Sequence, residues 1–149
     1  MYKKIVLAYD GSLESQQAII NCKDLSQWED AHVHLVSVVA YDAIAMGHET
    51  AYFNEYQNKI EEGRCLIILQ EGIAQLTASG ISAQGELLKG DPVSRISTYA
   101  NSVGADLIML GHKHRNNWLE RWWKGSISQS LIEISSCSVL VVITSQTDF

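Results

Sequence analysis

The segment KIVLAYDGS, residues Lys4–Ser12, shows how the chain begins to fold. Its first part, KIVLAY, is short and almost continuously apolar, which is typical of a strand that is covered on both faces. Asp10-Gly11-Ser12 then supplies the turn residues that end such a strand. From Ser12 to about Gln27, apolar residues recur at helical spacing. The segment therefore predicts a buried strand that leads directly into a helix.

Further apolar runs repeat the strand pattern along the chain. They are His32–Tyr41, Ile81–Lys89, Ala105–Leu110 and Ser138–Ile143. The run at Ile81–Lys89 is the weakest, and its Gly85 indicates a bulge or an edge position.

Helical patterns occupy the intervals between these runs. After a looser segment, Asp42–Thr50, a long helix is predicted, and its apolar residues suggest one stripe: Phe53, Tyr56, Ile60, Ile67, Ile73 and Leu76. Further on, Asp91 fits a helix cap, Pro92 fits the first helical position, and Gly104 fits the stop. A final helix is expected over Ser126–Ile134.

Alternation of strand and helix throughout predicts an α/β fold: a three-layer sandwich with a five-stranded parallel sheet and helices on both faces. Ligands of such sheets bind at the carboxyl ends of strands, where the winding reverses. The two turns best suited to an anion, Asp10-Gly11-Ser12 and Gly111–Ser126, follow the first and fourth strands. If both belong to one site, those strands are neighbours and the strand order is 3-2-1-4-5. Residues 1–149 are expected to form a single domain, since no linker or repeat divides them.

Composition narrows the classes of partner. The chain is 46% hydrophobic and 19% charged, as ordinary globular proteins are, and its net charge of −6 argues against a broad nucleic-acid interface. The first apolar run is too short for a signal sequence or a membrane span, so no membrane partner is expected. The three cysteines, Cys22, Cys65 and Cys137, are odd in number and widely separated, which favours packed, reduced thiols in a cytoplasmic protein.

The common catalytic and cofactor motifs are missing from the sequence. It has no P-loop, no dinucleotide-binding glycine pattern, no nucleophile elbow and no Cys-x-x-Cys pair. His112 and His114 alternate and could grip one ion, but two ligands fall short of a zinc site. Exposed or phosphate-facing rings are the alternative for this pair. His32 and His34 lie in an apolar strand and are expected to be packed or hydrogen-bonded.

Several motifs together resemble the universal stress protein family over nearly the whole chain. These are the opening KIVLAYDGS, the GDP that begins a helix, ADLIMLG before the charged segment, and GSIS followed by CSVLVV near the end. The resemblance implies a small α/β stress-response protein that forms a homodimer through its last strand, here Ser138–Ile143. An apolar edge strand of this kind invites pairing with a second copy on physical grounds too.

Many members of that family bind ATP, whereas a second branch lacks the nucleotide motif. The motif runs from a glycine through a second glycine to a third glycine followed by Ser or Thr. Gly111 matches its start and Gly125-Ser126 its end, but His114 replaces the middle glycine and one residue is inserted before Gly125. The resemblance also assigns Asp10 to the bound nucleotide and Val38, or alternatively Val39, to the adenine.

The leading hypothesis is ATP binding, with magnesium where required, and with phosphates held around Gly111, His114 and the turn that contains Gly125, Ser126, Ile127 and Ser128. No general base can be assigned, so the chain is not expected to be an enzyme, and any hydrolysis should be slow. Asp10 could also cap the first helix, and Gly125-Ser126 could be a plain helix cap.

The alternative hypothesis is a dimeric interaction module without nucleotide. In that case the Trp-rich segment, with Trp118, Trp122 and Trp123, would form the partner surface. Packing of these rings and stacking on a base remain open, as do the roles of Arg121 and Lys124 as partners of Glu120 or of phosphate.

Overall fold

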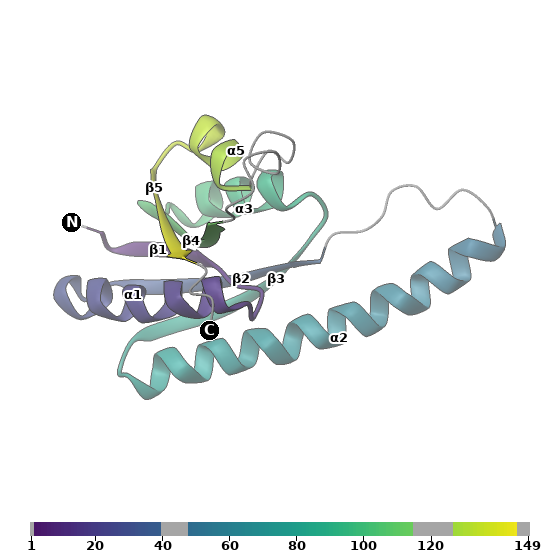
Figure 1. Ribbon diagram of the computed structural model, residues 1–149, viewed down its shortest axis with the longest axis horizontal. Coiled ribbons are helices and arrows are strands. Elements are labelled where there is room, and N and C mark those ends of the chain that lie inside the picture. Colours follow the sequence, from purple (N-terminus) through teal and green to yellow (C-terminus); the bar gives the residue numbers. More distant parts are fainter. Residues whose placement is uncertain (1, 40–47, 115–126, 146–149) are drawn as a thin grey trace.

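The computed structural model describes residues 2–39, 48–114 and 127–145, and strands and helices alternate along them (Figure 1). The elements are β1 (Lys4–Ala8), α1 (Leu13–Glu29), β2 (His32–Val39), α2 (His48–Ala78), β3 (Ser82–Lys89), α3 (Pro92–Val103), β4 (Leu107–His114), α5 (Ile127–Ile134) and β5 (Ser138–Ser145). None of the helices in these ranges is both long enough and apolar enough to cross a membrane.

The strands form one parallel sheet in the order β3-β2-β1-β4-β5, which confirms the predicted architecture. Helices α1 and α2 cover one face of the sheet, and α3 and α5 cover the other (Figure 1). Two apolar layers result, one on each face of the central strands.

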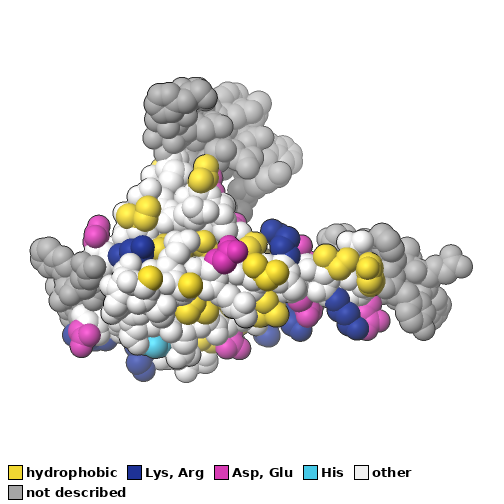
Figure 2. Space-filling model, turned by 90° about the horizontal axis from the view of Figure 1, so that it is seen from below, with side chains coloured by type: hydrophobic (Ala, Val, Ile, Leu, Met, Phe, Trp, Pro, Cys, Tyr) yellow, Lys and Arg dark blue, Asp and Glu magenta, His cyan; other side chains and the backbone are white. Residues whose placement is uncertain are grey.

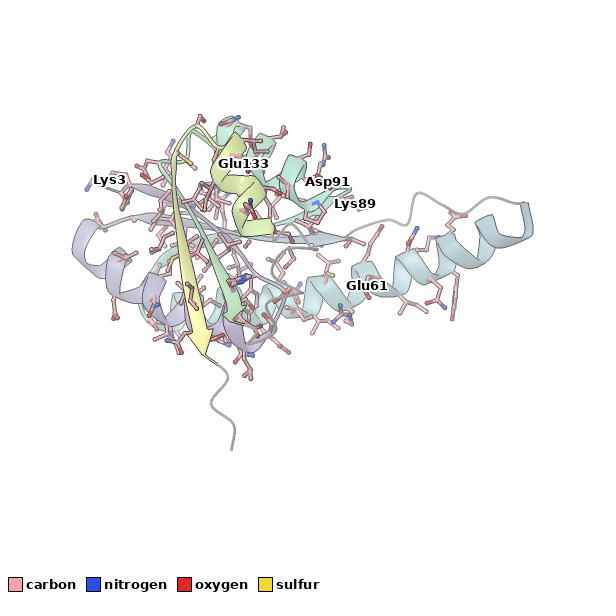
Figure 3. All side chains as sticks on the ribbon, turned by 45° about the horizontal axis from the view of Figure 1, so that its top comes forward. Lys3, Glu61, Lys89, Asp91 and Glu133 are labelled. Atoms are coloured by element: carbon pink, nitrogen blue, oxygen red, sulfur yellow. The ribbon has the colours of Figure 1, made fainter. Side chains whose placement is uncertain are left out.

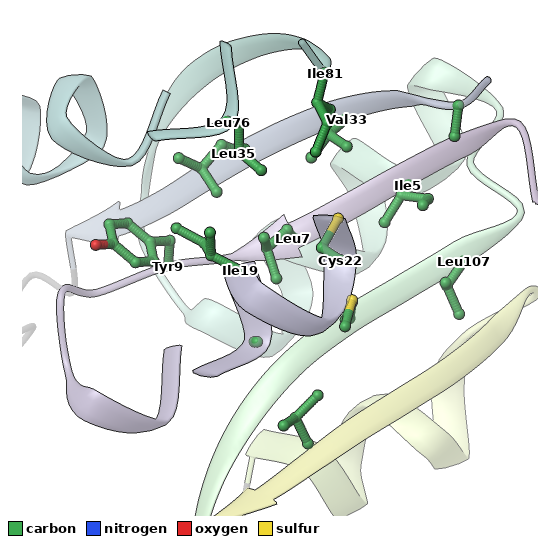
Figure 4. Packing of buried hydrophobic residues seen from close by; sticks show 14 of the residues in the cluster. Ile5, Leu7, Tyr9, Ile19, Cys22, Val33, Leu35, Leu76, Ile81 and Leu107 are labelled. Atoms are coloured by element: carbon green, nitrogen blue, oxygen red, sulfur yellow. The ribbon is translucent and has the colours of Figure 1, made fainter. Parts of the chain in front are cut away.

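Strand β1 illustrates why a continuous apolar run was required. Ile5 and Leu7 pack in the layer under α1 and α2, whereas Val6 packs in the layer under α3 and α5, and all three side chains are fully buried. Burial of each such side chain stabilises the fold by about 1.5–3 kcal/mol relative to leaving it exposed. Figure 4 shows the layer under α1 and α2, where Ile19 and Cys22 of α1 meet Leu7 and its neighbours.

Helix α3 begins and ends as its sequence predicts. The Asp91 side chain accepts a hydrogen bond from the backbone N–H of Ser94 at 2.9 Å, and Pro92 occupies the first helical position. Gly104 ends the helix in the left-handed conformation, with φ 69°. Each end therefore has its own physical signal in the sequence.

The predicted apolar stripe of α2 is only partly correct. Leu76 is fully buried, but Tyr56, Ile60 and Ile67 are 64%, 51% and 59% exposed. Figure 2 shows apolar side chains of this kind among charged ones on the outer surface. The packed face of α2 instead follows Cys65, Leu69, Gly72, Ile73 and Leu76.

Glycines explain the difference, because a pattern built from large side chains overlooks them. A Cβ on Gly72 would lie 2.6 Å from Leu35 Cδ2 and 2.8 Å from Tyr9 Cε1, so α2 approaches the sheet at this point. A Cβ on Gly85 of β3 would collide with Ile73 Cδ1 of the same helix. Gly85 lies in an edge strand, as predicted, but its regular pairing with Leu35 excludes the predicted bulge.

Two predicted boundaries are also wrong. Helix α2 already begins at His48, within the segment expected to be loose, whose residues 42–47 lie outside the described ranges. Strand β4 runs on to His114, where the sequence suggested an irregular segment from Gly111 onward. The extra residues are strand because β5 supplies a partner for each of them, from Gly111↔Val142 to His114↔Ser145.

Candidate functional site

Strands β1 and β4 are neighbours and separate at their carboxyl ends. Their pairing ends at Leu7↔Met109, beyond which β4 continues beside β5 alone. Chain winding reverses between these two strands, and that is where ligands of open α/β sheets bind. The two predicted turns therefore begin from adjacent strands, as the proposed strand order required.

On the β1 side, the turn after the strand is held by its own side chains. Asp10 Oδ1 accepts a hydrogen bond from the Ser12 N–H at 2.9 Å. Ser12 Oγ accepts one from the Ser15 N–H at 3.2 Å, and Ser15 Oγ donates to the Ser12 carbonyl at 3.0 Å. Ser12 is therefore the N-cap of α1, so the alternative role suggested for Asp10, a cap on this helix, is wrong. Asp10 acts two residues earlier and fixes the entry into the cap.

The charge of Asp10 follows from the same contacts. Partial burial raises the pKa of Asp10, but hydrogen bonds from Ser12 and Ser15 outweigh that effect, and the pKa lies below its ordinary value. Asp10 is consequently a carboxylate at neutral pH, and it remains exposed at the end of β1.

Tyr9 forms the buried base of the turn. Its side chain is 5% exposed, its N–H donates to the Val36 carbonyl at 2.8 Å, and its carbonyl accepts from Ser37 Oγ at 2.6 Å. Burial, followed by the charges of Glu71 and Asp10, raises the pKa of Tyr9, so the phenol stays neutral. These bonds tie the residue before Asp10 to β2.

On the β4 side, Gly111 is required by packing. A Cβ at this position would overlap the backbone carbonyl of Glu14 and lie 2.7 Å from the Ser15 nitrogen. Backbone atoms cannot rotate away as the end of a side chain can, so only glycine lets β4 lie against the first turn of α1. Sequence reasoning had assigned Gly111 to a ligand and missed this contact.

The remaining predicted residues are placed unevenly. His114 ends β4, and Ile127 and Ser128 begin α5, with the Ile127 side chain 43% exposed. Gly125 and Ser126 lie outside the described residues, as do the three tryptophans and the Arg and Lys of 115–124. The phosphate turn therefore stays a prediction.

The two valines suggested for adenine differ in accessibility. Val38 is half-buried and packs against the layer under α3, whereas Val39 is 1% exposed. The Val39 carbonyl accepts a hydrogen bond from the Gly90 N–H at 3.0 Å. Val38 is thus the more accessible of the two to a ligand.

Helix α2 contributes residues that sequence reasoning did not assign to the site. The Ile68 side chain lies over the Asp10 turn, where a Cβ on Gly11 would be 3.1 Å from Ile68 Cγ2. One turn earlier, Arg64 forms an ion pair with Glu61, and Asp10 contributes to raising the pKa of Arg64. A helical spacing of four links Arg64 to Ile68, but the sequence does not tell which residue of α2 lies level with Asp10.

The histidines of β2 are packed and hydrogen-bonded, as predicted. His32 contacts Ser82 Oγ at 2.6 Å and Gln84 Oε1 at 3.0 Å, while His34 Nδ1 lies 3.1 Å from Tyr99 Oη. Burial, followed by the charges of His32 and Lys4, lowers the pKa of His34. Within the described residues, no three His, Cys, Asp or Glu side chains are grouped so as to hold a metal ion.

Comparison with known proteins shows which family has this sequence and fold. The model of the Universal stress protein family matches residues 1–142. Universal stress protein MJ0531 of Methanocaldococcus jannaschii is 30% identical over 143 residues, which cover 95% of this chain and 82% of the relative. The solved structure of hypothetical protein MJ0577 superposes with a TM-score of 0.80 at 25% identity and 99% coverage of both chains.

Two further solved structures carry nucleotides. A universal stress protein in complex with cAMP has a TM-score of 0.70 at 20% identity, covering 96% of this chain and 98% of its own. A family protein from Arabidopsis thaliana with AMP bound has a TM-score of 0.68 at 17% identity, covering 95% and 91%. At these identities the likeness concerns the fold, whereas the family match spans residues 1–142. The chain therefore belongs to the universal stress protein family.

Proposed function

We propose that this protein binds an adenine nucleotide, ATP with magnesium in the first instance, at the carboxyl ends of β1 and β4. The observation that carries the proposal is the ionised, locally fixed Asp10 at the point where these two strands separate. The adenine nucleotides in solved members of the family support the choice of ligand.

In this proposal, each residue has the role that the family resemblance implies. Asp10 faces the nucleotide, and Val38 lies near the adenine. Backbone N–H groups around Gly111 and at Gly125, Ser126, Ile127 and Ser128, before and at the start of α5, hold the phosphates. The first N–H groups of a helix and its dipole stabilise an anion at the helix N-terminus. His114 stands where the family motif has a glycine, so we expect weaker binding than in a member with glycine at this position.

The proposed role is binding rather than catalysis. Asp10 already accepts a hydrogen bond from its own turn, and its lowered pKa makes it a poor base at neutral pH. Asp10 can position a magnesium ion or a water. Because it is a poor base, we expect any hydrolysis to be slow.

Calorimetry with Mg-ATP tests the proposal, together with absorbance at 260 nm of the supernatant after the purified protein is denatured. We expect wild type to bind ATP weakly, His114→Gly to bind more tightly, and Gly125→Val to lose binding. Ser126→Ala should weaken binding about tenfold, corresponding to ~1–2 kcal/mol for a lost hydrogen bond. Absence of binding by both wild type and His114→Gly would refute the proposal.

A second candidate function, a homodimeric interaction module, is favoured by the β5 edge. β5 is the last strand of the described sheet, and Leu140 and Ile143 are 38% and 63% exposed along it. Val141 points the other way and packs against the layer under α3 and α5. We propose pairing of two β5 strands, in which Leu140 meets the partner copy.

Light scattering tests the dimer. Leu140→Lys should yield a monomer or insoluble protein, because it places a charge within an apolar edge. A well-behaved wild-type monomer at micromolar concentration would contradict the dimer without affecting the nucleotide proposal.

A further inference from the structure

An arginine of α2 lies one helical turn from the residue that covers the Asp10 turn. Ile68 covers Gly11, with 3.1 Å between Ile68 Cγ2 and the position of a Cβ, and Arg64 precedes Ile68 by four residues, which is one helical turn on the same face. Because α2 connects the parallel strands β2 and β3, it runs opposite to them, so residues before Ile68 lie further toward the carboxyl ends. Arg64 is therefore at the end of the sheet where the ligand is proposed to bind.

Arg64 is held there by a two-point ion pair. Its Nη2 lies 2.5 Å from Glu61 Oε1, and its Nε donates to Glu61 Oε2 at 3.1 Å. The side chains are 59% and 44% exposed, respectively, so solvent screens the pair strongly. Figure 3 shows Glu61 on α2, and the neighbouring Glu62 is paired with Lys89 at 3.2 Å.

Among the described side chains near the turn, the charge of Arg64 is engaged by an acidic neighbour. The hydrogen bond that Arg64 donates to Glu61, and then the charge of Glu61, raise the pKa of Arg64, and Asp10 adds a smaller contribution. While Glu61 is paired with Arg64, the charge of Arg64 is not available to Asp10 or to an incoming phosphate. A nucleotide phosphate arriving at this point needs a positive charge, and Arg64 supplies it only by leaving Glu61.

We propose that Arg64 is a specificity-determining residue that exchanges Glu61 for a phosphate of the bound nucleotide, and that Glu61 competes with the ligand for it. This inference rests on the proposed nucleotide function. The planar guanidinium binds a carboxylate and a phosphate by the same two-point geometry, so one partner can replace the other. Since an exposed ion pair is weak, the exchange costs little. The contribution of Arg64 to affinity increases with the charge of the phosphate groups. Arg64 should therefore strengthen the binding of ATP more than that of AMP, and it should not affect the binding of adenosine.

The test compares adenosine, AMP and Mg-ATP by calorimetry at low ionic strength, where exposed charges are least screened. Arg64→Gln should weaken ATP binding about threefold to tenfold and leave adenosine unchanged. Glu61→Gln should tighten ATP binding by a few fold, and the double variant should bind like Arg64→Gln. Lys23→Gln in α1 removes the same charge three turns from Ser12, and it should change ATP binding less than twofold.

The outcomes separate the inference from the function on which it rests. ATP binding that is equal in wild type and Arg64→Gln overturns the role of Arg64 while leaving nucleotide binding intact. Equal loss of ATP and adenosine binding in Arg64→Gln also overturns it, because a purely structural effect would not depend on phosphate. If wild type binds neither adenosine nor ATP, the nucleotide function fails, and this inference fails with it. Circular dichroism and thermal unfolding establish that each variant is folded.

Discussion

Replacing Gly111 by alanine tests the contact that joins the two sides of the site. The added Cβ would overlap the Glu14 carbonyl and lie 2.7 Å from the Ser15 nitrogen, so either β4 or the first turn of α1 must move. Overpacking of this kind costs about 1–3 kcal/mol, and alanine recovers about 0.4–1 kcal/mol by restricting the unfolded chain. Because the obstructing atoms belong to the backbone, we expect a net destabilisation of about 1–2 kcal/mol.

Gly63 supplies the matched control. It is an exposed glycine inside α2, and no heavy atom would lie within 4 Å of an added Cβ. Gly63→Ala should therefore stabilise the protein by about 0.5–1 kcal/mol through helix propensity alone. The same chemical change is expected to have opposite signs at the two positions.

Urea unfolding followed by circular dichroism at one fixed protein concentration measures both free energies. The two variants should differ by about 1.5–3 kcal/mol, or about 3–12 °C in thermal midpoint for a chain of this size. A Gly111→Ala protein as stable as wild type, alongside a stabilised Gly63→Ala protein, would refute the close approach of β4 to α1.

Three other predictions follow from burial and charge. The neutral ring of His34 is favoured in the folded state, because its pKa is lowered there. The stability that His34 contributes should be fully present above the unfolded pKa of about 6.5 and should fall below that pH by up to ~1.4 kcal/mol per pH unit. Urea titrations from pH 8 to pH 5 should show a smaller loss of stability in His34→Gln. Leu76→Ala should lower the free energy of unfolding by about 2–5 kcal/mol and Ile67→Ala by less than about 0.5 kcal/mol, because the first side chain is fully buried and the second is 59% exposed. Equal losses would show that both side chains are packed, as the predicted apolar stripe of α2 required. Burial raises the pKa of the Cys65 and Cys137 thiols, so labelling with a thiol reagent at neutral pH should be slow until denaturant is added, and rapid native labelling of either thiol would contradict this.

The strands and their order could be predicted because each decision depended on a local pattern. Local residue types indicate each of these features: the apolar run of β1, the helix cap at Asp91 and the helix end at Gly104. Order in the sheet needed one further step, the assumption that two anion-suited turns share a site. The observed pairing of β1 with both β2 and β4 confirms the order, whereas the shared site stays a prediction.

Contacts between distant elements could not be read in the same way. Glycines carry no side chain to mark which face is packed, so the approach of α2 at Gly72 and Gly85 was invisible in the apolar pattern. The large residues Ile60 and Ile67 were misassigned for the same reason, since size was taken as a sign of burial.

The site shows this limit most clearly at Gly111. The family motif assigns Gly111 to the ligand. The structure shows a second reason for glycine at this position, because a Cβ would collide with the backbone of Glu14 and Ser15. This close packing links β4 to the turn that holds Asp10, because Ser15 both lies against Gly111 and is hydrogen-bonded to Ser12. A member of the family could thus retain Gly111 for the sake of folding alone, even after losing its nucleotide. The presence of Gly111 is therefore weak support for ATP binding. Substitutions at His114 and Arg64 discriminate better, because the first alters the glycine motif itself and the second removes an exposed charge that pairs with Glu61.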